Sequence, residues 1–233
     1  MRLKTTLAGL LIAFLLDIHG FSQVSNRNGT NPQIQAILNK TTLYINNDYA
    51  KIEGDPFVDK EFQKGILQFK NSVVVSDIPI RLNHYTDQIE FKENNKILGL
   101  ANPEDIIQAQ FGTHTFIYSE FKVGNKNKDG YFEVLANGKV KLLCRRESIV
   151  KREQIPASDY SGGNFRDYFR TTKEYYLKKG DEPAHKIMKS QKSVFKFLPE
   201  KETELKIYIK SQHLRINKDK DLIKLINYYN SIS

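Results

Sequence analysis

The feature that most constrains the fold of this chain is a pair of strand-like segments joined by Asn137-Gly138. The two segments, residues 131–135 and 140–145, are rich in aromatic, β-branched and aliphatic side chains. Asn-Gly between such segments favours a two-residue turn whose central residues adopt positive φ. The sequence therefore predicts a β-hairpin here. Short turns between consecutive strands also predict an antiparallel sheet.

Other short segments with the same character surround this hairpin. They are separated by turn residues and comprise residues 65–69, 77–82, 88–92, 96–101, 113–121, 173–178 and 184–188. Pro79 lies in one of them and cannot donate to a sheet ladder, so we expect its strand to be an edge strand or to carry a bulge. Residues 155–172 contain Pro156, Gly162 and Gly163, which predict a loop.

The last part of the chain changes to helical periodicity. Pro199 is typical of the first turn of a helix, and the glutamates that follow complement the helix dipole. Asn217 or Asp219 is expected to cap a second helix. The apolar stripes of the two helices, which we expect to pack on the sheet, are Leu205, Tyr208 and Ile209, and Leu222, Leu225, Ile226 and Tyr229. The predicted fold class is α+β, mainly antiparallel β: a meander of hairpins with two C-terminal helices packed on it.

The N-terminus has the three-part pattern of an export signal. A basic start, Met1 to Lys4, precedes an apolar run over residues 5–16, and Gly20 and Ser22 supply small residues for cleavage. The apolar run is shorter than the roughly 20 residues that cross a bilayer. We therefore expect an exported protein that is periplasmic, outer-membrane-associated or secreted, with no transmembrane span in the mature chain.

The predicted organisation follows from these segments. We expect a signal peptide at 1–22, a flexible leader with a short helix near 33–38 within 23–52, and a β-rich domain at 53–198. The helical pair occupies 199–233 and belongs to the same domain. The mature chain of 211 residues is long enough to bury a core without disulfides. Cys144 is the single cysteine, and its alternation with apolar neighbours predicts burial.

The sequence contains no recognisable catalytic, cofactor-binding or metal-binding motif. His84, His114, His185 and His213 lie outside zinc-ligand spacings. Asp55, Asp59 and Glu61 lack the spacing of a calcium loop and predict a turn. The first hypothesis is therefore a non-catalytic binding or structural protein of the cell envelope. The alternative is a hydrolase acting on an envelope polymer or lipid, which requires those histidines or carboxylates to converge in a pocket.

Charge is distributed unevenly along the chain. The net charge is −3 over residues 23–120, +9 over 121–196 and +2 over 197–233. A basic region at 141–196 favours an anionic lipid, an anionic glycan or an acidic envelope protein as partner, while a solvated basic face is the alternative. Nucleic acid is not expected as the partner of an exported protein. The candidate anionic-ligand patch consists of Arg145, Arg146, Arg152, Arg166 and Arg170.

Four scattered segments carry a resemblance to a wider group of proteins. Residues 53–57, 80–83 with 85–87, 130–135 and 228–230 resemble segments of uncharacterised exported proteins common in Bacteroidota-type bacteria. The resemblance implies a location in the envelope or outside the cell. It implies no activity, cofactor or catalytic residue.

Overall fold

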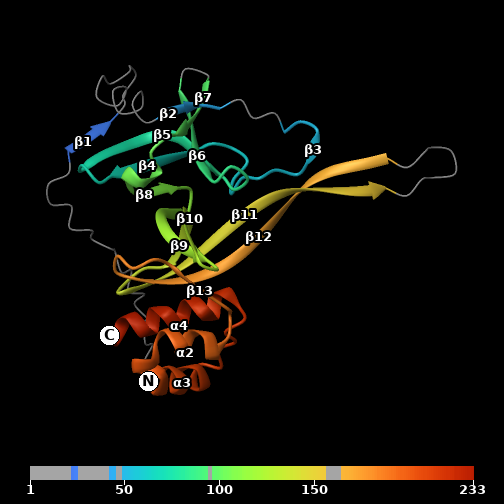
Figure 1. Ribbon diagram of the computed structural model, residues 1–233. Coiled ribbons are helices and arrows are strands. Elements are labelled where there is room, and N and C mark those ends of the chain that lie inside the picture. The colour runs from blue at the N-terminus through green and yellow to red at the C-terminus, as the bar shows by residue number, and fades with distance from the viewer. Residues whose placement is uncertain (1–21, 26–41, 46–48, 94–95, 156–163) are drawn as a thin grey trace, which may run out of the picture.

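The computed structural model describes residues 22–25, 42–45, 49–93, 96–155 and 164–233 (Figure 1). Residues 1–21 of the signal peptide expected at 1–22, the short helix expected at 33–38 and residues 156–163 of the expected loop lie outside these ranges. None of the helices within the described ranges is long and apolar enough to cross a membrane.

The described residues form one sheet of thirteen strands, in which most neighbours are antiparallel. The strand order is β13-β12-β11-β10-β9-β8-β4-β5-β6-β7-β2, with β1 beside β5 and β3 beside β12. The strand bounds are β1 (Ser22–Ser25), β2 (Thr42–Tyr44), β3 (Ile52–Glu53), β4 (Gln63–Phe69), β5 (Val73–Asn83), β6 (Gln88–Glu93), β7 (Lys96–Leu100), β8 (Ile106–Phe111), β9 (His114–Val123), β10 (Lys126–Ala136), β11 (Val140–Ile155), β12 (Asn164–Lys179) and β13 (His185–Ile187). The predicted fold class, mainly antiparallel α+β, is confirmed.

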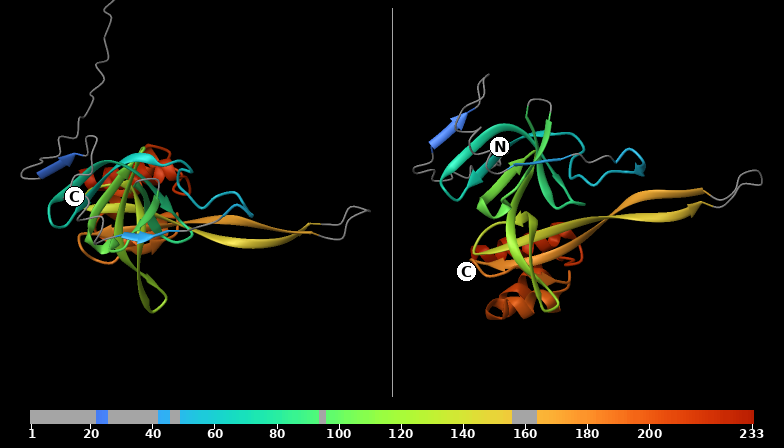
Figure 2. Two further views of the ribbon diagram at one scale, coloured as in Figure 1. Left: turned by 90° about the horizontal axis from the view of Figure 1, so that it is seen from above. Right: turned by 45° about the horizontal axis from the view of Figure 1, so that its top comes forward.

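The sheet curls strongly, so that the turn between β5 and β6 comes back against β11. The backbone N–H of Ser148 donates to the carbonyl of His84 at 3.1 Å, and the N–H of His84 donates to the carbonyl of Pro56 at 2.8 Å. Figure 2 shows the curled strands from two further sides. The concave face buries an apolar core that includes Leu67, Ile80, Leu82, Phe91, Phe111 and Phe116. This closure brings the β5–β6 turn to the point where β11 leaves the sheet.

Helices cover the other end of the sheet. They are α2 (Gln191–Phe197), α3 (Glu202–Ser211) and α4 (Asp219–Ser231), with short 3₁₀ turns η1 (Pro103–Asp105) and η2 (Pro199–Lys201). Their apolar side chains share a core with β10 to β13. The predicted packing on the sheet is confirmed for α4, which lies against β10 and β11, whereas α3 packs mainly on α4. The fully buried members of this core include Val140, Leu142, Leu177, Val194, Leu205, Leu222, Leu225 and Ile226.

Two details of the helices differ from the prediction. Helix α2 was missed, although Ser190 is a standard N-cap residue and accepts a hydrogen bond from the N–H of Ser193 at 3.3 Å. The N-cap of α4 is Lys218, which makes no side-chain cap, so the expected cap by Asn217 or Asp219 was wrong. Asp219 instead accepts a hydrogen bond from the hydroxyl of Tyr175 at 2.7 Å, which ties the start of α4 to β12.

The predicted hairpin is present, but its turn is different. The connection from β10 to β11 has three residues, Asn137 to Lys139, and the register shifts between Val134 and Ala136. Asn137 does not have positive φ, whereas Gly138 has φ 157°. The expected two-residue turn was therefore wrong, because a bulge changes the register just before the Asn-Gly pair.

The strand that contains Pro79 carries a bulge, as expected, but the bulge lies at Ser76 and Asp77, and Pro79 itself lies opposite Lys64. Ile78 pairs with Gly65 and Val75 pairs with Leu67, so β5 has one extra residue at this point. Asp77, within the extra stretch, has φ 60°. β5 lies between β4 and β6 and is not an edge strand. Its pairing with β6 begins at Ile80, beyond the proline.

The loop predicted at 155–172 and the leader predicted at 23–52 also need correction. β11 continues to Ile155 and β12 begins at Asn164, so the described part of the predicted loop is strand. Strands β1, β2 and β3 lie within or beside the expected leader. The carboxylate-rich turn is confirmed, since Asp55 accepts a hydrogen bond from the N–H of Phe57 at 3.1 Å. Burial of Cys144, which is 2% exposed, is confirmed as well.

Candidate binding surface on the β11–β12 hairpin

The β11–β12 hairpin is the longest element of the molecule and has two distinct halves. Its strands pair without a break from Val140 opposite Lys179 to Ile155 opposite Asn164. Residues 140–146 and 173–179 form the proximal half, on the sheet. Residues 147–155 and 164–172, here called the arm, project beyond the rest of the molecule (Figures 1 and 2). Nine residues at strand spacing give the arm a length of about 30 Å.

The base of the arm is anchored by aromatic side chains. The ring of Phe169 lies 5.2 Å from that of Tyr49 and 5.5 Å from that of Tyr85, both edge to face. β3 adds a short parallel pairing to β12, with Ile52 opposite Asp167. Each such ring pair stabilises the fold by about 0.5–1.5 kcal/mol beyond the contribution of the apolar area that it buries. These contacts fix the direction in which the arm leaves the body.

All five arginines of the predicted patch lie on this hairpin, but alternation along the strands divides them between two faces. Arg146 and Arg152 are on one face, and Arg145, Arg166 and Arg170 are on the other. The structure therefore brings them to one element and does not gather them into a single cationic surface.

Two of these arginines are paired at the base of the arm. Arg145 donates to a carboxylate oxygen of Asp87 at 2.8 Å, and its side chain is only 12% exposed. Arg146 forms an ion pair with Glu133. Both arginines thus connect β11 to neighbouring elements, and each is paired with a carboxylate.

Two more are paired within the arm itself. Arg152 makes a two-pronged contact with Asp167, with both N···O distances 2.8 Å. The hydrogen bonds from Arg152 hold the pKa of Asp167 below its usual value. Arg166 contacts Glu153 at 2.7 Å and Glu53 at 3.2 Å. Arg170 is exposed, and no ion pair of it is found among the described residues. The net charge of the arm is only +1 over its described residues.

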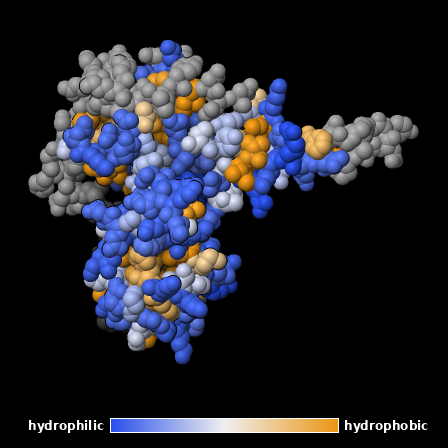
Figure 3. All heavy atoms as spheres, viewed as in Figure 1, coloured by the Kyte–Doolittle hydropathy of each residue, from blue (hydrophilic) through white to orange (hydrophobic). Residues whose placement is uncertain are grey.

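The arm instead exposes large apolar side chains and an unpaired strand edge. Ile149 is 38% exposed, Ile155 43% and Phe165 64%. Figure 3 shows hydrophobic residues on the surface of the arm between charged ones. Pairing of β11 with β10 ends at Cys144, so the backbone of residues 149–155 has no neighbouring strand on that side within the described part of the chain. These positions were not predicted from the sequence, although the aromatic and β-branched residues of 149–150 and 165–169 are typical of strands.

A cluster of histidines and charged groups lies beside the base of the arm. Nδ1 of His114 lies 2.6 Å from Oε1 of Glu133, whose other oxygen pairs with Arg146. Burial acts to raise the pKa of Glu133, but these two partners outweigh burial and the pKa is lowered. His84 is 5% exposed, and its Nε2 has no hydrogen-bond partner among the residues that the structure describes. Burial, with smaller contributions from Arg146 and Arg145, lowers the pKa of His84 to about 4.

This cluster brings together some of the groups considered for catalysis and not others. The carboxylate of Asp59 faces the same glycine, Gly112, as the ring of His114. His185 and His213 are exposed elsewhere. Glu133 already has two partners, so the arrangement ties β9, β10 and β11 together. Within the described residues, no group of three or more potential ligands is placed to hold a metal ion.

Comparison of the chain with protein-family models, curated proteins and solved structures finds no match. Any functional inference therefore depends on the geometry and chemistry of the residues themselves.

Proposed function

We propose that this chain is an exported protein of the cell envelope with a non-catalytic role, and that it binds a protein partner through the arm. The observation that supports this proposal most directly is the exposure of the arm: apolar side chains project into solvent from a pre-formed hairpin whose β11 edge is unpaired beyond the sheet. The export pattern at the N-terminus supports the proposed location. A partner strand would extend the sheet along residues 149–155 and reach both faces of the arm, with Ile149 and Ile155 on one face and Phe165 on the other.

The chemistry of the arm favours a protein over an anionic polymer. The arm carries four cations and three carboxylates. Carboxylates of the hairpin already hold Arg152 and Arg166, which leaves Lys151 and Arg170 to bind such a polymer. An open strand edge is instead a standard element for pairing with another backbone. Aromatic and aliphatic side chains beside such an edge supply the buried area that gives an interface its affinity.

The arm is also ordered before binding, which reduces the entropy cost of association. A two-stranded ribbon alone is marginally stable in water. Here the aromatic contacts of Phe169 and the cross-strand pair of Arg152 with Asp167 hold the strands in register. The proposed partner therefore meets a surface that needs little rearrangement.

Site-specific photo-crosslinking in the producing cells tests this proposal. A benzophenone amino acid at Phe165 is expected to give a discrete crosslinked product with a protein. The same substitution at Ile207 on α3, which is equally exposed at 64%, is the matched control and is expected to give none. Adding the charge-introducing substitution Ile155→Asp to the chain with the benzophenone at position 165 should abolish this crosslinked product. Equal products from both positions, or none from position 165, would rule out the arm as the docking element.

A further inference from the structure

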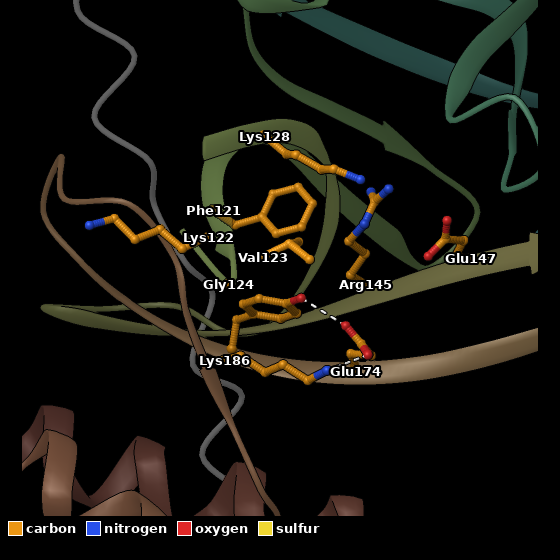
Figure 4. A pocket seen from close by; sticks show the side chains of 10 residues that line it. Phe121, Lys122, Val123, Gly124, Lys128, Arg145, Glu147, Glu174 and Lys186 are labelled. Carbon is orange, nitrogen blue, oxygen red and sulfur yellow. Dashed lines mark hydrogen bonds and ion pairs between the residues drawn. The ribbon is translucent and has the colours of Figure 1, made fainter. Parts of the chain in front are cut away.

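A cleft of about 250 Å³ lies between the β9–β10 turn and the β11–β12 hairpin. It opens on the face of β11 that bears Arg145, whereas Leu142 and Cys144 on the opposite face pack toward the helices. Phe121 and Tyr176 form its apolar floor, in edge-to-face contact at 5.7 Å. Its charged lining residues are Lys122, Lys128, Arg145, Lys186, Glu147 and Glu174 (Figure 4).

The positive charge of the cleft is only partly compensated. Glu174 accepts a hydrogen bond from the hydroxyl of Tyr176 at 2.8 Å and forms an ion pair with Lys186, so these charges cancel. Lys122 points away from the centre in Figure 4, while the cationic ends of Lys128 and Arg145 point toward the same part of the cleft. Two cations are therefore directed at one space.

Arg145 is rigidly held in a position to bind. Its Nη1 donates to Asp87 at 2.8 Å, and the guanidinium lies 4.9 Å from the ring centroid of Phe121. A Cβ atom at Gly130 would lie 2.3 Å from Nη1 of Arg145 and 2.7 Å from the carboxylate of Asp87, so glycine is needed for this pair to lie against β10. Nη1 is occupied, whereas no hydrogen bond of Nε or Nη2 to the described residues is found. A guanidinium edge of this kind matches the oxygens of a phosphate group.

We propose that this cleft binds the phosphate group of a small molecule between Arg145 and Lys128. Arg145 supplies two parallel donors, and Lys128 supplies a flexible point charge from the exposed first residues of β10, where it lies opposite Phe121 of β9. The volume is below the roughly 300–1,000 Å³ of sites for drug-sized ligands. A phosphate with few attached atoms therefore fits, and both a free phosphate ester and a phospholipid head group offer this chemistry.

Isothermal titration calorimetry of the mature chain with inorganic phosphate and with glycerol 3-phosphate tests the site. Lys128→Gln is expected to raise the dissociation constant about five- to tenfold, because one unit charge near the anion is lost. Glu147→Gln removes the carboxylate of the cleft that is not held by Lys186, and it should lower the dissociation constant about two- to fivefold. Lys210→Gln on α3 removes the same charge at a distant exposed site and should change nothing. The exposed position of Lys128 lets the variant keep the wild-type unfolding midpoint.

Vesicles of phosphatidylcholine with and without phosphatidylglycerol distinguish the two sources of phosphate. Binding of glycerol 3-phosphate without binding to the anionic vesicles supports a soluble phosphate ester. Binding to those vesicles that depends on Lys128 supports a lipid head group. The site is refuted by an absence of binding to all of these probes, by equal weakening in Lys128→Gln and Lys210→Gln, or by failure of Glu147→Gln to strengthen binding.

Discussion

The proximal half of the β11–β12 hairpin and the arm are made from the same two strands, yet different interactions surround them. In the middle of the proximal half the cross-strand pairs are apolar, from Leu142 opposite Leu177 to Cys144 opposite Tyr175, and the helices cover the face that bears Leu142 and Leu177. The arm instead contains two oppositely charged cross-strand pairs, Arg152 opposite Asp167 and Glu153 opposite Arg166. The backbone ladder is continuous through both halves. Hydrogen-bonded pairing therefore does not decide which half is buried.

The two halves of one strand pair are therefore stabilised in different ways. The proximal half gains its stability from apolar area removed from water. The arm depends on local contacts at its base and between its strands, which are worth less because water screens them. A segment stabilised in this way opens locally at lower cost than the core. It also keeps its apolar side chains available to a partner.

The largest effect that separates the two halves is expected from truncating apolar side chains. Leu177→Ala leaves a cavity beneath the helices, where the side chain is 0% exposed, and should lower the free energy of unfolding by about 2–5 kcal/mol. Ile149→Ala on the arm, where the side chain is 38% exposed, should change it by no more than about 0.5 kcal/mol. Urea unfolding followed by circular dichroism measures both. Similar losses from the two variants would mean that the arm is packed in solution.

A smaller effect is expected from pH at the boundary between the halves, where the carbonyl of His84 accepts a hydrogen bond from Ser148. Burial lowers the pKa of His84 from 6.5 to about 4. The unfolded chain therefore binds more protons than the folded chain between these values, and stability falls as the pH falls. From about pH 7.5 to about pH 5 the loss from this group should be about 2 kcal/mol.

The variant His84→Gln provides the control for this pH dependence. It cannot titrate, so its free energy of unfolding should fall by about 2 kcal/mol less than that of the wild type over the same range. The charged groups that face His84, namely Arg145, Arg146, Glu133 and His114, remain in both proteins. Parallel pH profiles for the two proteins would show that His84 is not buried in its neutral form.

The sequence was sufficient to predict the parts of the fold that follow local periodicity. The hairpin at 131–135 and 140–145, the bulge near Pro79 and the helices after Pro199 were all predicted correctly. The arm was missed because Pro156, Gly162 and Gly163 indicate a loop. The length of its strands depends on contacts that are remote in sequence, such as that of Phe169 with Tyr49. No pattern within the hairpin reveals that partner.

The arginines illustrate the same limit for the candidate site. Their number and spacing indicated a basic surface, but the partners of Arg145 and Arg152 follow from tertiary contacts and strand register. Asp87 is 58 positions away from Arg145, and Asp167 comes opposite Arg152 only in a hairpin with full-length strands. Charge composition therefore identified the hairpin that carries the arginines, but not that carboxylates pair with most of them. The exposed apolar residues became recognisable as a surface only once the projection of the arm was known.

The smallest expected effect concerns the ion pairs of the arm. Arg152→Gln breaks the two-pronged contact with Asp167 and should leave the global unfolding midpoint unchanged, because the pair is exposed and the core does not depend on it. Amide hydrogen exchange of residues 150–155 and 165–169 should become about two- to fivefold faster, while exchange at 140–144 stays the same. Lys151→Gln removes the same charge from the neighbouring position, where no ion pair among the described residues is lost. Faster exchange in both variants would attribute the effect to net charge. Faster exchange in Arg152→Gln alone would show that the ion pair keeps the two strands of the arm paired.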